Sequence, residues 1–193
     1  EINSFKKEKY YTVEISMNGF TLSTDRIDDK IVAEQLKNLI GEKIEITDVI
    51  KKEKITKPNL PFDLTTLQRE CNKYFGYSAK QTLDYAQSLY EKKLCTYPRT
   101  DSRYLTGDMA DSLPVLVNLV VNAMPFCKEI AITCDPQTVI NDKKVTDHHA
   151  VIPTRNLKDA DLSALPAGEK AVLELVALRL MCAVAQPHIY SET

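Results

Sequence analysis

The hydrophobic pattern of this chain changes its period near residue 57, and this change limits the possible folds more than any other feature. Apolar residues alternate with polar ones along residues 11–17, which is the spacing of a β-strand with one buried face. From residue 64 onward apolar residues recur every three or four positions, the spacing of an amphipathic helix. The sequence therefore predicts an α+β chain, with a small β-rich segment followed by a mainly helical domain.

The β-rich segment, residues 1–56, has the signals of a hairpin, a helix and a further strand. Asn18-Gly19 separates two strand-like runs and is a tight-turn pair. A helix is expected over 31–40, with Gly41 as its C-terminal cap, and a strand over 44–49. Charged residues at 51–54 and prolines at 58–61 then predict a linker.

The helical domain is expected over 57–188, with 189–193 returning toward the β-rich segment. One helix should end at Gly76, and Ser78 with Gln81 forms a capping box for the next. Two helices, a short turn and then a strand carrying Tyr97 predict winged helix-turn-helix character. Further helices are expected over about 108–124, with Pro114 near the start, and over 167–185, as part of the core.

Residues 96–102 (Thr-Tyr-Pro-Arg-Thr-Asp-Ser) concentrate the reactive groups of the chain. In an extended backbone Tyr97 and Arg99 project from the same side and Pro98 points away. A tyrosine hydroxyl can attack a phosphodiester, and a guanidinium can stabilise the charge on its oxygens. Because a phenol has a pKa of about 10, it needs such help at neutral pH. The alternative is a strand end at which Tyr97 only packs and Asp101 makes a turn.

The run 94–105 resembles the active-site tyrosine segment of type IA DNA topoisomerases, and its Pro-Arg and Arg-Tyr-Leu elements resemble the bacterial topoisomerase III branch. Residues 147–154 (Asp-His-His-Ala-Val-Ile-Pro-Thr) resemble the second signature of that family. Residues 61–68 resemble the beginning of its tyrosine-bearing domain. Thr146-Asp147 departs from the family pattern, in which small or glutamate residues are commoner. Three signatures in the family's order are more specific than one.

The resemblance implies a set of roles for individual residues. Tyr97 would be the nucleophile that links to a 5′ DNA phosphate, and Arg99 its electrostatic partner. His148 would donate to a phosphate oxygen or move a proton, with Asp101 as its orienting carboxylate. The resemblance further implies DNA contacts by five neighbours of these residues: Thr96, Thr100, Ser102, Arg103 and His149.

The resemblance also implies ATP-independent cleavage and religation of single-stranded DNA, with relaxation and decatenation as the outcome. Magnesium would be held by an Asp-x-Asp-x-Glu cluster, which does not occur in these 193 residues. Residues 1–56 would be part of a β-rich arch, and the other domains of the same polypeptide would be partners. The chain alone is then expected to be monomeric and inactive. The same resemblance implies a cytoplasmic, nucleoid-associated protein.

Composition limits the alternatives. The five cysteines have no close Cys-x-x-Cys spacing, so we expect free thiols and no zinc site. The formal charge is −2, which predicts weak DNA binding by the isolated chain because phosphate neutralisation dominates such affinity. A local basic patch is left open by this argument and would comprise Lys73, Lys80, Lys92, Lys93, Arg99 and Arg103.

No apolar run reaches membrane-spanning length, and no membrane contact is expected. The chain starts with Glu1, from which we expect a piece of a longer protein. Two further hypotheses stay open beside the topoisomerase. One is a helix-turn-helix regulator without catalysis, and the other is an interaction module in which the tyrosine motif is structural.

Overall fold

The computed structural model describes residues 6–17, 19–41, 45–127 and 133–193, and it divides the chain into two units. The first unit comprises residues 1–51 with Thr193, and the second comprises residues 52–192. The structure is α+β, as predicted, and each unit is considered by itself below.

The first unit contains a hairpin and one helix. Strands β1 (Glu14–Met17) and β2 (Phe20–Ser23) are antiparallel, with Met17 opposite Phe20. A two-residue connection is therefore confirmed. Gly19 has φ +97°, a backbone conformation that residues other than glycine rarely adopt. Asn18 lies outside the described residues. Helix α1 (Lys30–Leu39) begins at the N-cap Asp29, whose side chain accepts a hydrogen bond from the Ile31 amide.

Two predictions for this unit were wrong. Gly41 is not a left-handed cap, because α1 ends at Ile40 in extended backbone with its amide bonded to Lys37. The strand expected over 44–49 is absent from residues 45–49, and Ile44 lies outside the described part of the chain.

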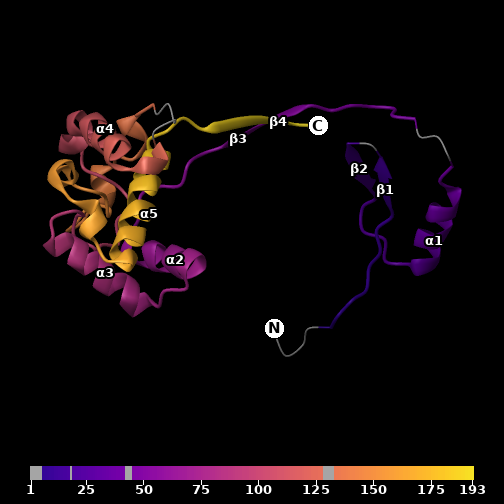
Figure 1. The fold of residues 1–193 in the computed structure, drawn as a ribbon. Coiled ribbons are helices and arrows are strands. Elements are labelled where there is room, and N and C mark those ends of the chain that lie inside the picture. The colour runs from indigo at the N-terminus through magenta and orange to yellow at the C-terminus, as the bar shows by residue number, and fades with distance from the viewer. Residues whose placement is uncertain (1–5, 18, 42–44, 128–132) are drawn as a thin grey trace. The chain divides into compact units, whose positions relative to one another are not determined.

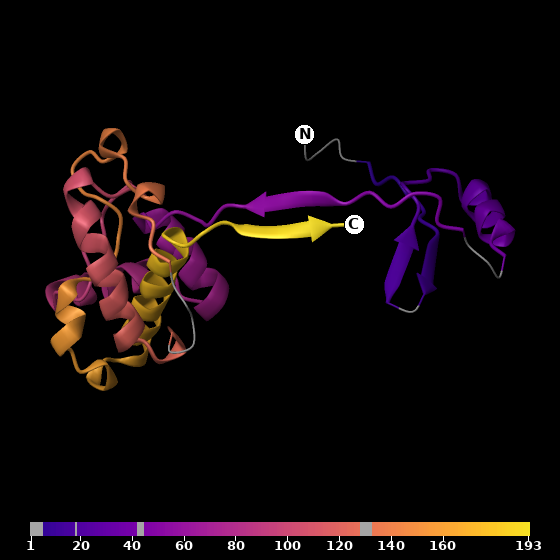
Figure 2. The same cartoon turned by 90° about the horizontal axis from the view of Figure 1, so that it is seen from above.

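The second unit begins and ends in one two-stranded sheet. Strand β3 (Lys52–Thr56) pairs antiparallel with β4 (His188–Glu192), and the two run side by side in both views (Figures 1 and 2). Residues 52–54, expected to belong to a linker, are therefore strand. All ten strand residues are exposed, so this strand is stabilised by backbone pairing with a distant segment and not by a hydrophobic face.

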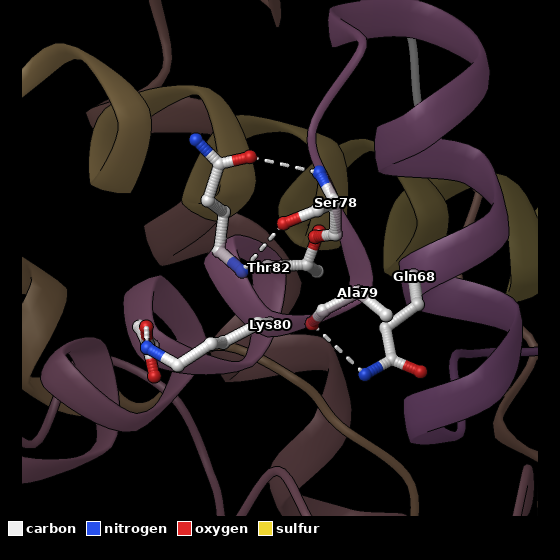
Figure 3. Close-up of polar contacts among 7 residues, drawn as sticks. Gln68, Ser78, Ala79, Lys80 and Thr82 are labelled. Atoms are coloured by element: carbon white, nitrogen blue, oxygen red, sulfur yellow. Dashed lines mark hydrogen bonds and ion pairs between the residues drawn. The ribbon is translucent and has the colours of Figure 1, made fainter.

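Helices α2 (Leu64–Phe75) and α3 (Ala79–Glu91) form a pair, and the end of α2 and the start of α3 follow the predicted signals. Gly76 caps α2 with φ 70°, and Ser78 and Gln81 form the capping box of α3. Figure 3 shows this turn, where the Gln68 side chain also donates to the Ala79 carbonyl at 3.0 Å. The Gln68 bond ties the start of α3 to α2.

Helices α4 (Leu113–Ala123) and α5 (Ala167–Ala183) complete the helical body. Pro114 lies in the first turn of α4, as predicted. α5 packs on α3 and buries residues on most of its sides, as expected of a core helix. Short 3₁₀ helices occupy the connections: Gly107–Ser112, Pro125–Cys127, Pro136–Thr138, Asp142–Lys144, Arg155–Asp159 and Leu162–Ala164.

Candidate active site

The tyrosine segment leaves α3 as extended backbone held against residues 150–154. Lys93, at φ 61°, turns the chain after the helix. Cys95 forms an isolated bridge with Pro153, and the Thr96 amide donates to the Ile152 carbonyl at 2.9 Å. The segment is thus not part of a regular strand, unlike the prediction of a strand carrying Tyr97.

Side chains nevertheless alternate along this segment as an extended backbone requires. Pro98, Thr100 and Ser102 are buried, whereas Arg99 and Asp101 are exposed and Tyr97 is half-buried. Because successive side chains of extended backbone point to opposite sides, the phenol, the guanidinium and the carboxylate share the open side. The predicted alternation is present without the predicted strand.

Three hydroxyl groups of the segment bond backbone groups in or just before the second signature. Thr96 Oγ1 donates to the Ala150 carbonyl at 3.1 Å and accepts from the Ile152 amide at 3.0 Å. Thr100 Oγ1 donates to the carbonyl of His148 at 2.8 Å, and Ser102 Oγ donates to that of Lys144 at 2.8 Å. The hydroxyls that the sequence suggested for DNA contact therefore have a structural role that the sequence did not predict. Their contact with DNA stays a prediction.

His148 lies against Tyr97 although the two are far apart in the sequence. Their ring centroids are 4.6 Å apart with an interplanar angle of 52°. His148 is exposed, and the neighbouring His149 is half-buried with Nδ1 2.8 Å from the Ala150 carbonyl oxygen. In the described structure, the aromatic contact of Tyr97 with this histidine pair is made by His148.

Tyr90 is a further neighbour of the candidate nucleophile, and sequence reasoning missed it. Its ring meets that of Tyr97 edge to face, with centroids 5.3 Å apart and an angle of 73°. Tyr90 is in the last turn of α3, seven residues before Tyr97. The sequence contained no signal for this contact, because it depends on the tight reversal of the chain at Lys93.

Arg99 and Asp101 are both exposed, but the predicted contact of Asp101 with His148 is not seen. Asp101 Oδ1 instead accepts a long hydrogen bond from Thr146 Oγ1, at 3.5 Å. Within the described ranges no carboxylate forms an ion pair with Arg99, which leaves its guanidinium open to an anion. An orienting role for Asp101 stays a prediction.

Three members of the expected basic patch are engaged by other groups of the protein. Lys80 pairs with Asp84 at 3.1 Å, and Lys92 pairs with the buried Glu169. Arg103 donates from Nε and Nη2 to the carbonyls of Pro61 and Leu60, each at 3.2 Å. Lys92, at the end of α3, is thus held by the Glu169 carboxylate of α5.

The cysteines are free, and no metal-binding cluster is found among residues whose placement is described. Burial raises the pKa of Cys95 to about 12. This thiol is two residues from Tyr97 but, as a neutral buried group, it packs and does not react. In the described ranges, no helix has both the length and the apolar character needed to cross a bilayer.

Comparison with known proteins agrees with these motifs. A family model described as DNA topoisomerase matches residues 1–193. DNA topoisomerase 3 from Staphylococcus saprophyticus is 35% identical over 98% of this chain, and the protein of that name from Bacillus subtilis is 33% identical over 100%. The chain spans 28% of the length of each of these relatives.

A solved structure, full-length topoisomerase I from Thermotoga maritima, matches with a TM-score of 0.67 and 24% identity. The match covers 95% of this chain and 30% of that one, and it supports the fold. The resemblance inferred from the tyrosine and histidine signatures is thereby confirmed. Because the family model extends over every residue, this chain belongs to the type IA DNA topoisomerase family.

Proposed function

We propose that this chain carries the nucleophile of an ATP-independent enzyme that cuts and rejoins single-stranded DNA. The observation that supports this proposal is the contact between the rings of Tyr97 and His148, whose centroids are 4.6 Å apart. The contact lies on the side of the segment that also exposes Arg99. A phenol, an imidazole and an exposed guanidinium together provide a nucleophile, a proton carrier and a charge stabiliser.

In the proposed reaction the Tyr97 oxygen attacks a backbone phosphorus atom. The new bond joins the tyrosine oxygen to the 5′ phosphate, and the bond from phosphorus to the 3′ oxygen breaks. The phenol loses its proton, and the leaving 3′ oxygen gains one to become a hydroxyl. Religation is the reverse, with the 3′ hydroxyl attacking the phosphotyrosine. Each step exchanges one phosphate ester for another, which explains why no ATP is needed.

Arg99 and His148 have separate parts in this proposal. The Arg99 guanidinium would neutralise the phosphate oxygens as the phosphorus becomes five-coordinate. His148 lies beside the phenol ring and would donate to a phosphate oxygen or carry the proton. Asp101 is proposed to orient His148 only after DNA binds, since the two have no hydrogen bond in the described structure.

Magnesium would support this reaction in the complete enzyme. The described part of this chain offers no cluster of three or more ligating side chains, so the residues present do not fit a metal site. We therefore propose that the metal belongs to another part of the polypeptide and that these 193 residues alone do not relax supercoiled DNA.

The domain assignment is proposed on the same grounds. Residues 1–56 would be part of an arch, 57–188 would present Tyr97, and 189–193 would return to the arch. Pairing of β3 with β4 supports a common junction, because both ends of the helical body lead into one two-stranded sheet. The proposed partners are the remaining domains of the polypeptide and single-stranded DNA. The proposed outcomes are relaxation and decatenation of DNA, by a cytoplasmic protein associated with the nucleoid.

A second candidate function is non-catalytic duplex binding through a helix-turn-helix. It is favoured by α2 and α3, which are joined by the short capped turn at Gly76. Winged helix-turn-helix character is a proposal for this pair. Tight duplex binding by the isolated chain would support it, but a formal charge of −2 argues against such affinity.

The decisive experiment compares wild type with Tyr97→Phe in the complete enzyme. Labelled single-stranded DNA is added with magnesium, the protein is denatured, and covalently attached label is measured. We expect an adduct with wild type and none with Tyr97→Phe, because phenylalanine keeps the ring but lacks the oxygen. Tyr104→Phe is the matched control and should retain the adduct. An undiminished adduct in Tyr97→Phe would rule out the proposed nucleophile.

A further inference from the structure

A second charged feature of the helical unit lies apart from the tyrosine ring. It is a cavity of about 310 Å³ beside α2, whose lining includes four cationic side chains, from Arg69, Lys73, Arg103 and Arg179. The single carboxylate in its lining is that of Glu70. Such an excess of cations is unusual in a chain with a formal charge of −2, and it makes the cavity a candidate site for an anion.

Two of the four cations are fixed by other parts of the protein. Arg179 pairs with Glu70 at 2.9 Å, lies over the Phe62 ring at 4.2 Å, and its side chain is 11% exposed. Arg103 donates two hydrogen bonds to backbone carbonyls, one from Nε and one from Nη2. These two bonds do not use Nη1, which remains able to donate to a ligand. Both guanidinium groups are therefore positioned before any ligand arrives, which lowers the entropy cost of binding.

The other two cations are free to respond to a ligand. Arg69 and Lys73 are four positions apart on α2, so they project from the same face of the helix. Both are exposed, and neither forms an ion pair with any residue in the described ranges. Lys73 Nζ lies over the ring of its neighbour Tyr74, at 5.1 Å.

We propose that this cavity binds a backbone phosphate of single-stranded DNA, as an anchoring contact separate from the phosphate attacked by Tyr97. A guanidinium matches a phosphate with two parallel hydrogen bonds, and Lys73 would add a point charge. Glu70 neutralises one of the four cations, so three positive charges remain to attract the negatively charged phosphodiester. The proposal rests on the proposed function, because it takes the strand to be the enzyme's substrate.

Arg103 links the cavity to the tyrosine segment. It belongs to the run that carries Tyr97 and Arg99, yet its side chain lines the cavity while Arg99 is exposed on the open side. One continuous segment therefore presents one guanidinium for chemistry and another for the anchor. A strand held at the anchor would be presented to the tyrosine by the same piece of backbone.

The test uses the 193-residue chain and a fluorescein-labelled oligothymidylate, with binding followed by anisotropy at several salt concentrations. Arg69→Gln/Lys73→Gln should weaken binding several-fold relative to wild type. The slope of log affinity against log salt should also become shallower, by about 0.7 for each phosphate of a single strand that the variant no longer neutralises. Both side chains are exposed, so the variant should keep its thermal unfolding temperature.

The matched control is Lys80→Gln/Lys170→Gln, which removes the same number of exposed helical cations outside the cavity. Its affinity and salt slope should stay closer to wild type. Equal losses of affinity in the two double variants would overturn the proposal, because the effect would then be one of net charge. Inorganic phosphate is tested in parallel, and a response of the cavity to phosphate but not to the oligonucleotide would exclude a DNA strand as the occupant.

Failure of this proposal is distinguishable from failure of the proposed function. In the complete enzyme, Arg69→Gln/Lys73→Gln should form the covalent adduct at saturating DNA but require more DNA to reach it. Tyr97→Phe should bind the oligonucleotide normally and form no adduct. Loss of the adduct at every DNA concentration in the double variant would contradict an anchoring role.

Discussion

Tyr97 owes its position to aromatic groups from two different parts of the chain. Tyr90 meets its ring edge to face from the end of α3, and His148 meets it from the loop before residue 150. These contacts limit the rotation of a ring that is only half-buried. At the residue scale, the structure thus supplies orientation as well as the reactive group.

Tyr90 should act as a positioning residue. Replacing it by alanine removes the edge contact, so Tyr90→Ala in the complete enzyme should slow adduct formation by roughly 10- to 100-fold, because a displacement of about 1 Å can have that effect. DNA affinity should change little. Tyr90→Phe keeps the ring and should restore the rate. The measurement is single-turnover cleavage, and a normal rate in Tyr90→Ala would show that the contact is incidental.

The buried thiol of Cys95 should make stability depend on pH in the alkaline range. Desolvation raises its pKa from the ordinary value of 9.0 to about 12. Between these values the unfolded chain has lost a proton that the folded chain retains, so the free energy of unfolding falls as pH rises, by up to about 1.4 kcal/mol per pH unit. Below a pH of about 9.0 the thiol is protonated in both the folded and the unfolded chain, so its stabilising contribution is fully present.

Urea unfolding of wild type and Cys95→Ala across this range measures the effect. The alanine variant should be less stable at neutral pH because it leaves a small cavity, but its stability should decline less steeply above the ordinary thiol pKa. Cys182→Ala is the control, since that thiol is exposed. Parallel pH profiles for wild type and Cys95→Ala would refute the assignment.

At the scale of elements, α3 and α5 are joined by a polar contact inside an otherwise apolar interface. The Glu169 side chain is 9% exposed, pairs with Lys92 and accepts from Ser88 Oγ at 2.9 Å. Both partners come from the end of α3, directly before the tyrosine segment. This carboxylate therefore holds the helix end from which the segment departs.

Glu169→Gln should lower the free energy of unfolding by about 1–3 kcal/mol, because Lys92 loses its charged partner and a buried amide group is imperfectly paired. Asp84→Asn is the matched control in α3, since it breaks the exposed Lys80–Asp84 pair, and it should cost about 0–1 kcal/mol. Equal costs for the two variants in urea titrations would mean that burial of Glu169 is unimportant.

At the scale of the whole molecule, nearly all of the hydrophobic core lies in one unit. The two large buried clusters consist of residues between Phe62 and Val184. In the described part of residues 1–51, the buried apolar side chains are those of Val13 and Ala33. Burial of apolar surface is the main favourable term in folding, so the second unit should not depend on the first for its stability.

Residues 52–192 produced alone should therefore fold, with an unfolding temperature within a few degrees of that of the second unit in the 193-residue chain. The β3–β4 pairing is contained in this segment and should persist. Calorimetry and circular dichroism measure the unfolding temperature of the segment, with the 193-residue chain as the reference. A segment that unfolds at a much lower temperature would show that residues 1–51 contribute to the core.

Local signals in the amino-acid sequence were sufficient to predict helices α2 and α3. The Ser78 capping box and the left-handed Gly76 cap depend on residues within a few positions of one another, so the end of α2 and the start of α3 could be assigned without knowledge of the fold. Gly41 shows the limit of such signals: the cap of α1 is Ile40 in extended backbone, and Gly41 is not left-handed.

Features that join distant residues could be learned only from the folded chain. Strand β3 is highly charged and exposed, and it forms because residues 188–192 satisfy its backbone hydrogen bonds. Likewise, Thr96 and Thr100 bond residues about fifty positions away and so bring His148 to the Tyr97 ring. Local sequence specifies the reactive group, whereas its neighbours are set by hydrogen bonds and packing between segments that no local pattern encodes.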